Sequence, residues 1–256
     1  MRKVAAILPA LLAPLAIGCM PLAALAAESG EEAAKPVKWE QWQADNSIED
    51  TASLQRGARN FMNYCNGCHA LKYERYQRMA DDLKIPMDVL QKDLVAPGSN
   101  ALSYITTSLP AADAANWFGK VPPDLSLITR SKGTDYVYRF LKTFYVDPST
   151  PTGSNNLALP GAAMPAVLSD LSGVYEAVYR QDGDQKVFDH FANIVPGSLT
   201  GAQYDDFVRD TVNFLDYVGE PSQIERRTIG IWVVLFLLFL TWLTWLLKKE
   251  YWKDVH

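Results

Sequence analysis

The segment Cys65-Asn66-Gly67-Cys68-His69 constrains this chain more than any other stretch, because it has the form C-x-x-C-H. Two thiols at this spacing on one helical turn can each add to a vinyl group of the same porphyrin. The histidine that follows can then bind the iron. The motif therefore predicts one haem c, held covalently by Cys65 and Cys68, with His69 as an iron ligand.

Other interpretations of a C-x-x-C pair fit this sequence less well. A thioredoxin-like redox pair is expected in a βαβ context, and no such pattern surrounds the motif. A zinc site needs two more ligands, and the only other cysteine, Cys19, lies in a predicted signal peptide. Chance occurrence of the motif is the remaining alternative.

The two ends of the chain predict export and membrane attachment. Arg2 and Lys3 precede an apolar run and a small-residue cleavage site at 24–26, which is the pattern of a secretory signal peptide. The uncharged apolar run over 229–247 is long enough, at ~1.5 Å per residue, to span a bilayer as a helix. Together these features predict a single-pass protein of the bacterial inner membrane, with the haem domain in the periplasm.

The same features divide the chain into five parts. We expect a signal peptide over 1–27, an N-terminal arm over 28–50, a periplasmic cytochrome c domain over 51–224, a transmembrane anchor helix over 225–247 and a cytoplasmic tail over 248–256.

Hydrophobic periodicity predicts an all-α domain. Helices are expected over 52–65, 71–83, 86–94, 111–118, 135–145, 169–181 and 200–219. Thr200 and Gln203 fit a capping box at the start of the last of these helices. The proline-rich stretch 147–165 is expected to be a long loop, and 182–196 a turn-rich excursion.

The charge of the chain limits its partners. Asp and Glu outnumber Lys and Arg by 29 to 24, which gives a formal net charge of -5. This sign disfavours a nucleic-acid partner, whose phosphates attract basic proteins. An acidic surface suits a basic protein partner, although acidity for solubility alone is an equally open interpretation.

The ligand opposite His69 decides what such a haem can do. An open position would suit a gas sensor or a peroxidase, whereas a second strong ligand favours electron transfer. Met164, in the proline-rich loop, is separated from His69 by enough chain to wrap the ring, and its thioether would raise the potential. His190 is the first alternative as the second iron ligand. The other candidates are His256, Met62, Met79 and Met87.

The chain from about residue 52 to its end resembles the cytochrome c1 family, the haem subunits of the cytochrome bc1 complex, in a proteobacterial form. The resemblance rests on the order and spacing of several motifs. These are C-x-x-C-H with Lys72-Tyr73-Glu74-Arg75-Tyr76, Pro122-Pro123-Asp124-Leu125-Ser126, Arg130, Gly133-Thr134-Asp135-Tyr136-Val137, Met164-Pro165, the capped helix, the anchor and Glu250-Tyr251-Trp252-Lys253.

The resemblance implies a c-type cytochrome fold, with helices around one haem and the first and last soluble helices crossing. It assigns thioether positions to Cys65 and Cys68 and axial iron positions to His69 and Met164. It also assigns haem-pocket positions to Arg130, which would meet a propionate, to its neighbour Tyr136, and to Pro122 and Pro123 beside the proximal histidine.

The resemblance further implies a place in ubiquinol–cytochrome c reductase. The chain would take electrons from the Rieske iron–sulfur protein and pass them to a periplasmic cytochrome c. Cytochrome b and the lipid bilayer would be its membrane partners, in a dimeric complex. In isolation it would be an electron carrier without catalytic residues. The alternatives are a free-standing anchored cytochrome c, a subunit of another oxidoreductase, a haem enzyme or ligand sensor, and a structural subunit with incidental haem.

Overall fold

The computed structural model describes residues 37–254. The predicted signal peptide and residues 28–36 of the predicted N-terminal arm lie outside the described residues. The elements in chain order are η1 Trp39–Gln41, α1 Thr51–Tyr64, β1 Leu71–Arg75, α2 Tyr76–Leu83, α3 Met87–Val89, η2 Leu90–Leu94, β2 Tyr104–Ile105, α4 Ala111–Phe118, α5 Ile128–Lys132, α6 Thr134–Lys142, β3 Phe144–Val146, β4 Ser154–Asn156, α7 Ser169–Ser172, β5 Gly173–Asp182, β6 Gln185–Pro196, α8 Gly201–Gly219 and α9 Gln223–Tyr251.

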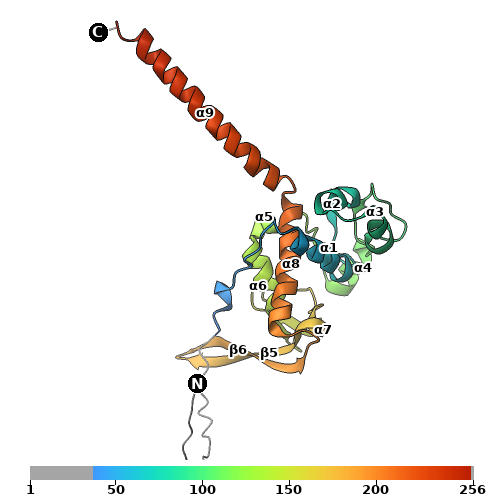
Figure 1. The fold of residues 1–256 in the computed structure, drawn as a ribbon. Helices are drawn as coiled ribbons and strands as arrows, with labels where there is room; N and C mark the ends of the chain where they lie inside the picture. The colour runs from blue at the N-terminus through green and yellow to red at the C-terminus, as the bar shows by residue number, and fades with distance from the viewer. Residues whose placement is uncertain (1–36, 255–256) are drawn as a thin grey trace, which may run out of the picture. The chain divides into compact units, whose positions relative to one another are not determined.

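Helices α1 and α8 pack against each other at the centre of the domain (Figure 1). The apolar stripe of α1, which includes Leu54, Ala58 and Phe61, is buried in the core. The two helix backbones come so close that a Cβ atom added at Gly57 would lie 2.0 Å from the carbonyl oxygen of Asp210. A glycine is therefore required at this contact, which joins the first and last helices of the domain as the family resemblance implies.

Polar contacts fix the position of α1 along α8. Arg56 donates two hydrogen bonds to the buried carboxylate of Asp210, from Nε to Oδ2 at 2.6 Å and from Nη2 to Oδ1 at 2.9 Å. Asn60 Nδ2 donates to Thr211 Oγ1 at 3.2 Å inside the interface. Buried polar groups that are paired in this way allow only one register between the two helices.

Helix α8 begins with the predicted capping box. The hydroxyl of Thr200 accepts from the backbone N–H of Gln203, and the Gln203 side chain accepts in return from the backbone N–H of Thr200. Behind this cap, Val208, Val212 and Leu215 are buried in the core. The prediction of a capped helix ending at residue 219 is thus confirmed.

The expectation of an all-α domain is not confirmed. The described residues contain three two-stranded antiparallel sheets, β1–β2, β3–β4 and β5–β6. The helix predicted over 71–83 begins only at Tyr76, because Leu71–Arg75 pairs with the distant strand β2. The helix predicted over 135–145 ends at Lys142, after which the chain enters β3.

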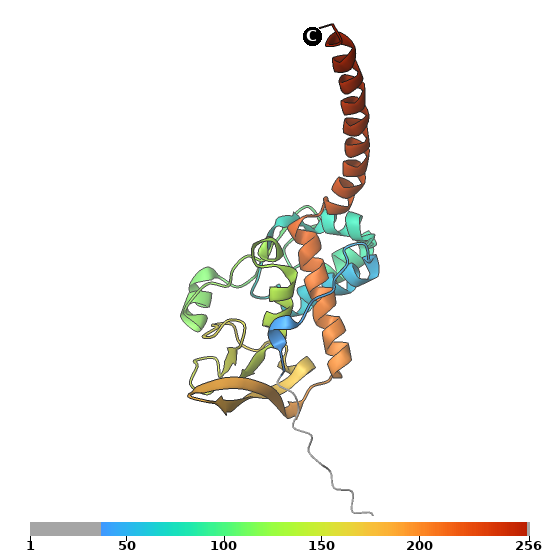
Figure 2. The same cartoon turned by 90° about the vertical axis from the view of Figure 1, so that its left-hand side faces the viewer.

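The helix predicted over 169–181 is wrong, and so is the turn-rich excursion that was expected after it. Helix α7 ends at Ser172, and the next residues form the long hairpin β5–β6, seen as the curved gold ribbon in the lower part of Figure 2. Cross-strand aromatic pairs stabilise the hairpin, with ring centroids 6.1 Å apart for Tyr179 and Phe188 and 6.0 Å apart for Tyr175 and Phe191.

Helix α9 contains the predicted anchor. Among the described residues it is the one helix long and apolar enough to cross a membrane, with a mean hydropathy of 2.3 over its most apolar window. Charged contacts lie at its start, where Arg226 donates to Glu220 at 2.6 Å and Arg227 donates to Glu49 at 3.0 Å. The helix fits a single-pass membrane anchor.

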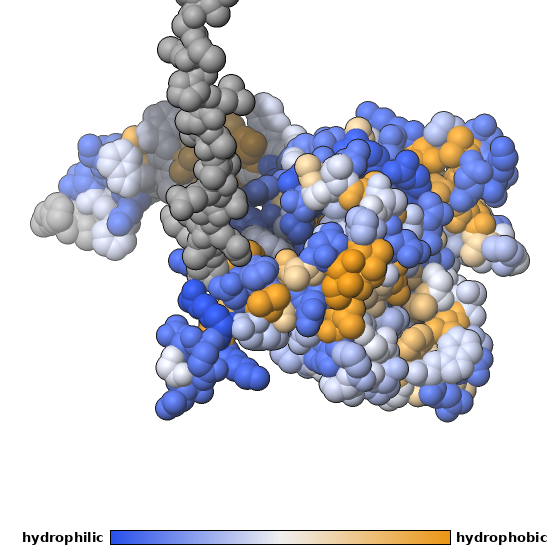
Figure 3. All heavy atoms as spheres, turned by 90° about the horizontal axis from the view of Figure 1, so that it is seen from below, coloured by the Kyte–Doolittle hydropathy of each residue, from blue (hydrophilic) through white to orange (hydrophobic). Residues whose placement is uncertain are grey.

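Large exposed apolar side chains are concentrated on α9, from Ile229 to Leu247. On the face of the domain seen in Figure 3, hydrophobic residues instead form small areas separated by hydrophilic ones. Since apolar surface is costly in water, this distribution suits a hydrated domain carried on a helix that lipid surrounds.

Candidate haem-binding site

The C-x-x-C-H motif forms a tight turn that continues α1. Backbone N–H groups of Cys65, Cys68 and His69 donate within the turn, from Cys65 to Phe61 O at 2.9 Å, from Cys68 to Cys65 O at 3.1 Å and from His69 to Cys65 O at 2.8 Å. Both thiols are free and half-buried. The turn therefore presents two thiols and an imidazole from one short piece of rigid backbone.

The imidazole of His69 is held in the form that binds a metal. Its Nδ1 lies 2.8 Å from the carbonyl oxygen of Pro123. Because a carbonyl can only accept, Nδ1 carries the proton and the lone pair of Nε2 is free for a ligand bond. Burial lowers the pKa of His69, which favours the neutral ring, and the Pro123 carbonyl and Asp124 oppose this shift.

The segment that contains Pro123 is fastened to the chain after the motif. The carboxylate of Asp124 accepts from the backbone N–H of Lys72 at 2.9 Å and from that of Ser126 at 3.0 Å. The backbone N–H of Leu125 donates to Ala70 O at 2.9 Å. No role for Asp124 was predicted from the sequence, although Pro-Pro-Asp signals a turn in which the aspartate caps its own backbone.

A second segment supports the motif from after β2. Asn66 Nδ2 donates to the carbonyl of His69 at 3.3 Å and to that of Thr106 at 3.2 Å. Thr107 Oγ1 donates to the carbonyl of Gly67 at 2.8 Å. The two residues between the cysteines thus tie the turn to the rest of the fold.

The surroundings of the two thiols fit covalent haem better than a site for a metal ion. Burial, with a smaller contribution from Cys68, raises the pKa of the Cys65 thiol to about 12. The Cys65 thiol is therefore neutral at physiological pH. Within residues 37–254 no group of three or more His, Cys, Asp or Glu residues could hold a metal ion.

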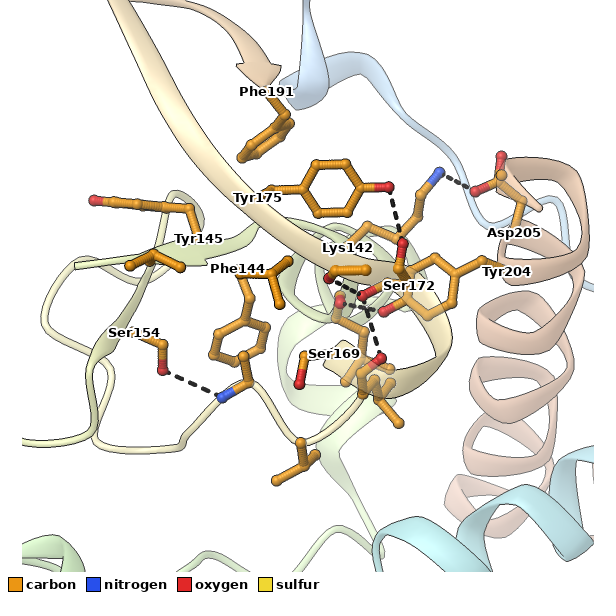
Figure 4. A pocket seen from close by; sticks show the side chains of 18 of the residues that line it. Lys142, Phe144, Tyr145, Ser154, Ser169, Ser172, Tyr175, Phe191, Tyr204 and Asp205 are labelled. Carbon is orange, nitrogen blue, oxygen red and sulfur yellow. Dashed lines mark hydrogen bonds and ion pairs between the residues drawn. The ribbon is translucent and has the colours of Figure 1, made fainter. Parts of the chain in front are cut away.

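Met164 lies between β4 and α7 on a loop that is fastened by a hydrogen bond from Ala166 N to Ser154 Oγ at 3.2 Å. It lines a cavity of about 220 Å³ whose walls come from α6, β3, the hairpin and α8 (Figure 4). The residues that line this cavity do not include the C-x-x-C-H motif. The axial pairing of Met164 with His69 therefore stays a prediction.

Polar groups around this cavity are paired with one another. Lys142 forms an ion pair with Asp205, with Nζ and Oδ1 2.5 Å apart. Tyr204 OH donates to Leu141 O at 2.9 Å, and Tyr175 OH donates to Ser172 O at 3.0 Å, as the dashed lines in Figure 4 show. The cavity therefore offers mainly apolar contacts.

The other predicted residues lie on separate elements. Arg130, on α5, is 56% exposed and pairs with Glu220, with Nη1 and Oε2 3.2 Å apart. Tyr136, on α6, has the ammonium of Lys132 5.9 Å from its ring centroid. His190, the alternative ligand, lies on β6 and pairs with its neighbour Asp189 at 2.9 Å.

Known sequences decide the family. The sequence profile of the Cytochrome C1 family matches residues 98–255. This chain belongs to the cytochrome c1 family. It is 45% identical to a cytochrome c1 of Allochromatium vinosum over 216 residues, which cover 83% of this chain and 88% of the relative.

Two further relatives carry other names. The ammonia monooxygenase gamma subunit of Nitrosomonas europaea is 39% identical over 207 residues, which cover 81% of this chain and 85% of the relative. Cytochrome b/c1 of Bradyrhizobium diazoefficiens is 28% identical over 256 residues, which cover 81% of this chain and 34% of that protein. Membership of the cytochrome c1 family confirms the predicted resemblance and the predicted cofactor, haem c.

Proposed function

We propose that this cytochrome c1 carries electrons from the Rieske iron–sulfur protein to a periplasmic cytochrome c in ubiquinol–cytochrome c reductase. The observation that best supports this proposal is the contact between His69 Nδ1 and Pro123 O at 2.8 Å, directly after a turn with two thiols. It leaves Nε2 as the ligand atom at the place where covalent haem would lie.

Each predicted residue has a role in this proposal. Cys65 and Cys68 would hold the cofactor through thioether bonds, and His69 and Met164 would bind its iron and exclude outside ligands. The bound haem supplies a centre that gains and loses one electron. Pro122 and Pro123 orient the histidine, and Tyr136 and Arg130 complete the pocket. Arg130 would exchange Glu220, its partner at 3.2 Å, for a haem propionate.

The membrane topology is part of the proposal. Residues 51–224 form the periplasmic domain, the anchor over 225–247 crosses the inner membrane, and the tail over 248–256 lies in the cytoplasm. The apolar, fully exposed surface of α9 supports contact with lipid and with cytochrome b. The complex would be dimeric, as the family implies.

Co-purification tests which proteins associate with this chain. The tagged protein is extracted from membranes in mild detergent, and its partners are identified. We expect a b-type cytochrome and a Rieske protein, and reduction of cytochrome c by quinol. A chain that emerges alone with a reducible haem would be a free-standing carrier, and the proposal would be wrong.

The axial ligand is tested by Met164→Leu, which removes the thioether and keeps the size of the side chain. We expect a lower midpoint potential and new binding of carbon monoxide to the ferrous protein, because leucine leaves the iron position open. Met87→Leu is the matched control, since Met87 lies on α3 and is already partly exposed. Equal spectra and potentials for Met164→Leu and wild type would exclude Met164 as the ligand.

A second candidate function follows from the relative in Nitrosomonas europaea, which is named as a subunit of ammonia monooxygenase. In that case the chain would serve an oxidoreductase other than the bc1 complex. The same purification distinguishes the two, because monooxygenase subunits would then replace cytochrome b and the Rieske protein.

A further inference from the structure

Glu74 lies buried on β1, the strand that follows the haem motif. It is 2% exposed, and its Oε1 has no hydrogen-bond partner among the residues that the structure describes. Buried polar atoms nearly always have partners, so an unpaired carboxyl oxygen here calls for an explanation. Neither the covalent attachment nor the axial ligation makes use of this side chain.

The charged and titratable groups that act on Glu74 come from α2 and α8. Arg78 and Asp82 lie on α2, and Tyr217 lies on α8. Arg78 Nε donates to Asp82 Oδ2 at 2.5 Å, and Tyr217 OH donates to the same oxygen at 2.7 Å. The cation of this group is therefore already paired with Asp82, and it acts on Glu74 only from a distance, without a hydrogen bond or ion pair to it.

This environment favours the protonated carboxyl. Burial, followed by the charge of Asp82, raises the pKa of Glu74 to about 7, and Arg78 opposes the shift. An ionised carboxylate without a donor is strongly disfavoured inside a protein, whereas a neutral carboxylic acid is tolerated. Glu74 is thus poised between its two forms near neutral pH.

The strand that carries Glu74 is coupled to the iron-ligating histidine. Backbone N–H groups of β1 donate to Asp124 and Ser126, in the same segment whose Pro123 carbonyl holds His69. Glu74 is the fifth residue after His69, so the two Cα atoms are at most about 18 Å apart. For charges on the iron and the carboxylate separated by a distance of that order, at an effective permittivity of about 20, a unit change of charge changes the proton affinity about five-fold.

We propose that Glu74 takes up a proton when the iron held by His69 is reduced, and releases it when the iron is oxidised. The inference rests on the proposed function, because it needs a haem at His69. One electron enters from an external donor, and a proton from solvent forms the O–H bond of the Glu74 carboxyl. With an about five-fold change in affinity the net uptake is at most about 0.4 proton per electron, because some of the carboxyls are already protonated and some stay ionised. Asp82, with a side chain that is 26% exposed, is the neighbour through which solvent can reach it.

The midpoint potential of the detergent-solubilised, haem-loaded full chain tests the proposal. In the wild type it should fall as the pH rises through neutrality. A five-fold change in proton affinity corresponds to about 40 mV, at 59 mV per tenfold change for one electron. Glu74→Gln should remove this slope. Glu176→Gln, the same change on an exposed position of β5, should keep it.

The redox difference infrared spectrum gives an independent readout on the wild type, should the Glu74→Gln protein fail to fold. Reduction should increase the carbonyl stretch of a protonated carboxylic acid. A reducible haem with a pH-independent potential, an unchanged slope in Glu74→Gln, or no such infrared band would each overturn this inference alone. Absence of covalent haem from the wild type would overturn the proposed function as well.

Discussion

Replacement of Gly57 by alanine tests whether the contact between α1 and α8 has room for any side chain. The added Cβ would lie 2.0 Å from the carbonyl oxygen of Asp210 and 2.6 Å from Cβ of Phe214. Neither atom can rotate away, because one belongs to the backbone of α8 and the other is fixed to it. Ordinary contact begins at 3.4 Å, so the helices must separate by about 1.4 Å.

Two opposing effects set the size of the change. Alanine is a better helix former than glycine by about 1 kcal/mol. Overpacking of a close contact costs about 1–3 kcal/mol, and more where backbone must move. Separation would also stretch the bidentate bond between Arg56 and Asp210, at 2.6 and 2.9 Å. We expect a net loss of about 2 kcal/mol, which lowers the unfolding temperature by about 4–8 °C in a domain of this size.

Thermal unfolding of the detergent-solubilised full chain, followed by circular dichroism, measures the effect. Gly201→Ala is the matched control, because Gly201 starts α8 and an added Cβ there would meet nothing within 4 Å. The control should unfold at the wild-type temperature or slightly above it. If Gly57→Ala does the same, the reasoning about this helix contact is wrong.

Two further predictions concern stability. Folding raises the pKa of Glu74 from 4.5 to about 7. Protonation of Glu74 therefore stabilises the fold fully below about pH 4.5, and this stabilisation is lost as the pH rises through about 7. In Glu74→Gln, the fall in unfolding temperature over that interval should be smaller than in the wild type, and an equal fall would contradict the shift. Thr200→Ala removes the N-cap of α8 and should cost about 1 kcal/mol, seen as a lower unfolding temperature. Thr200→Ser, which keeps the hydroxyl, should stay close to the wild type, and equal losses in both variants would argue against the cap.

Features that depend only on residues close together in the chain could be predicted from the sequence. The capping box of Thr200 and Gln203 needs only residues three apart, and the structure contains both of its hydrogen bonds. The buried stripe of α1 repeats every three or four residues, so its amphipathic period shows in the sequence alone. The C-x-x-C-H turn is equally local, and its spacing places both thiols on one turn.

The hairpin was missed although its sequence carries a signal. Val174, Tyr175, Val178 and Tyr179 have the β-branched and aromatic character of strands, and Gly183 adopts a positive φ of 60° in the turn. A Gly-Asp pair between two such runs, here Gly183-Asp184, is typical of a two-residue β-hairpin loop. Greater weight on this turn would have corrected the helix predicted over 169–181.

Other features depend on partners that sequence reasoning could not pair. Strand β1 exists because Leu71 pairs with Ile105, far along the chain, and the short segment alone shows no strand period. The roles of Asp124 as a support and of Glu74 as a buried acid depend equally on distant elements. The family resemblance gave the positions of Pro122 and Pro123, but it did not give the hydrogen bond from His69 Nδ1 to a carbonyl.

The hairpin β5–β6 has a consequence for solubility. A two-stranded sheet has open edges, which can recruit strands from other copies and start aggregation. Here the pairing of the two strands shifts register twice, and charged side chains such as Arg180 and Lys186 lie along them. The backbone N–H of Val37 also donates a hydrogen bond to the carbonyl oxygen of Asp189 at 2.8 Å. Bulges and charges of this kind disfavour edge-to-edge addition. In the unfolded chain, however, the segment 174–179, in which Glu176 is the one charged residue, has the β-branched and aromatic composition of an aggregation-prone segment, so folding itself removes the hazard.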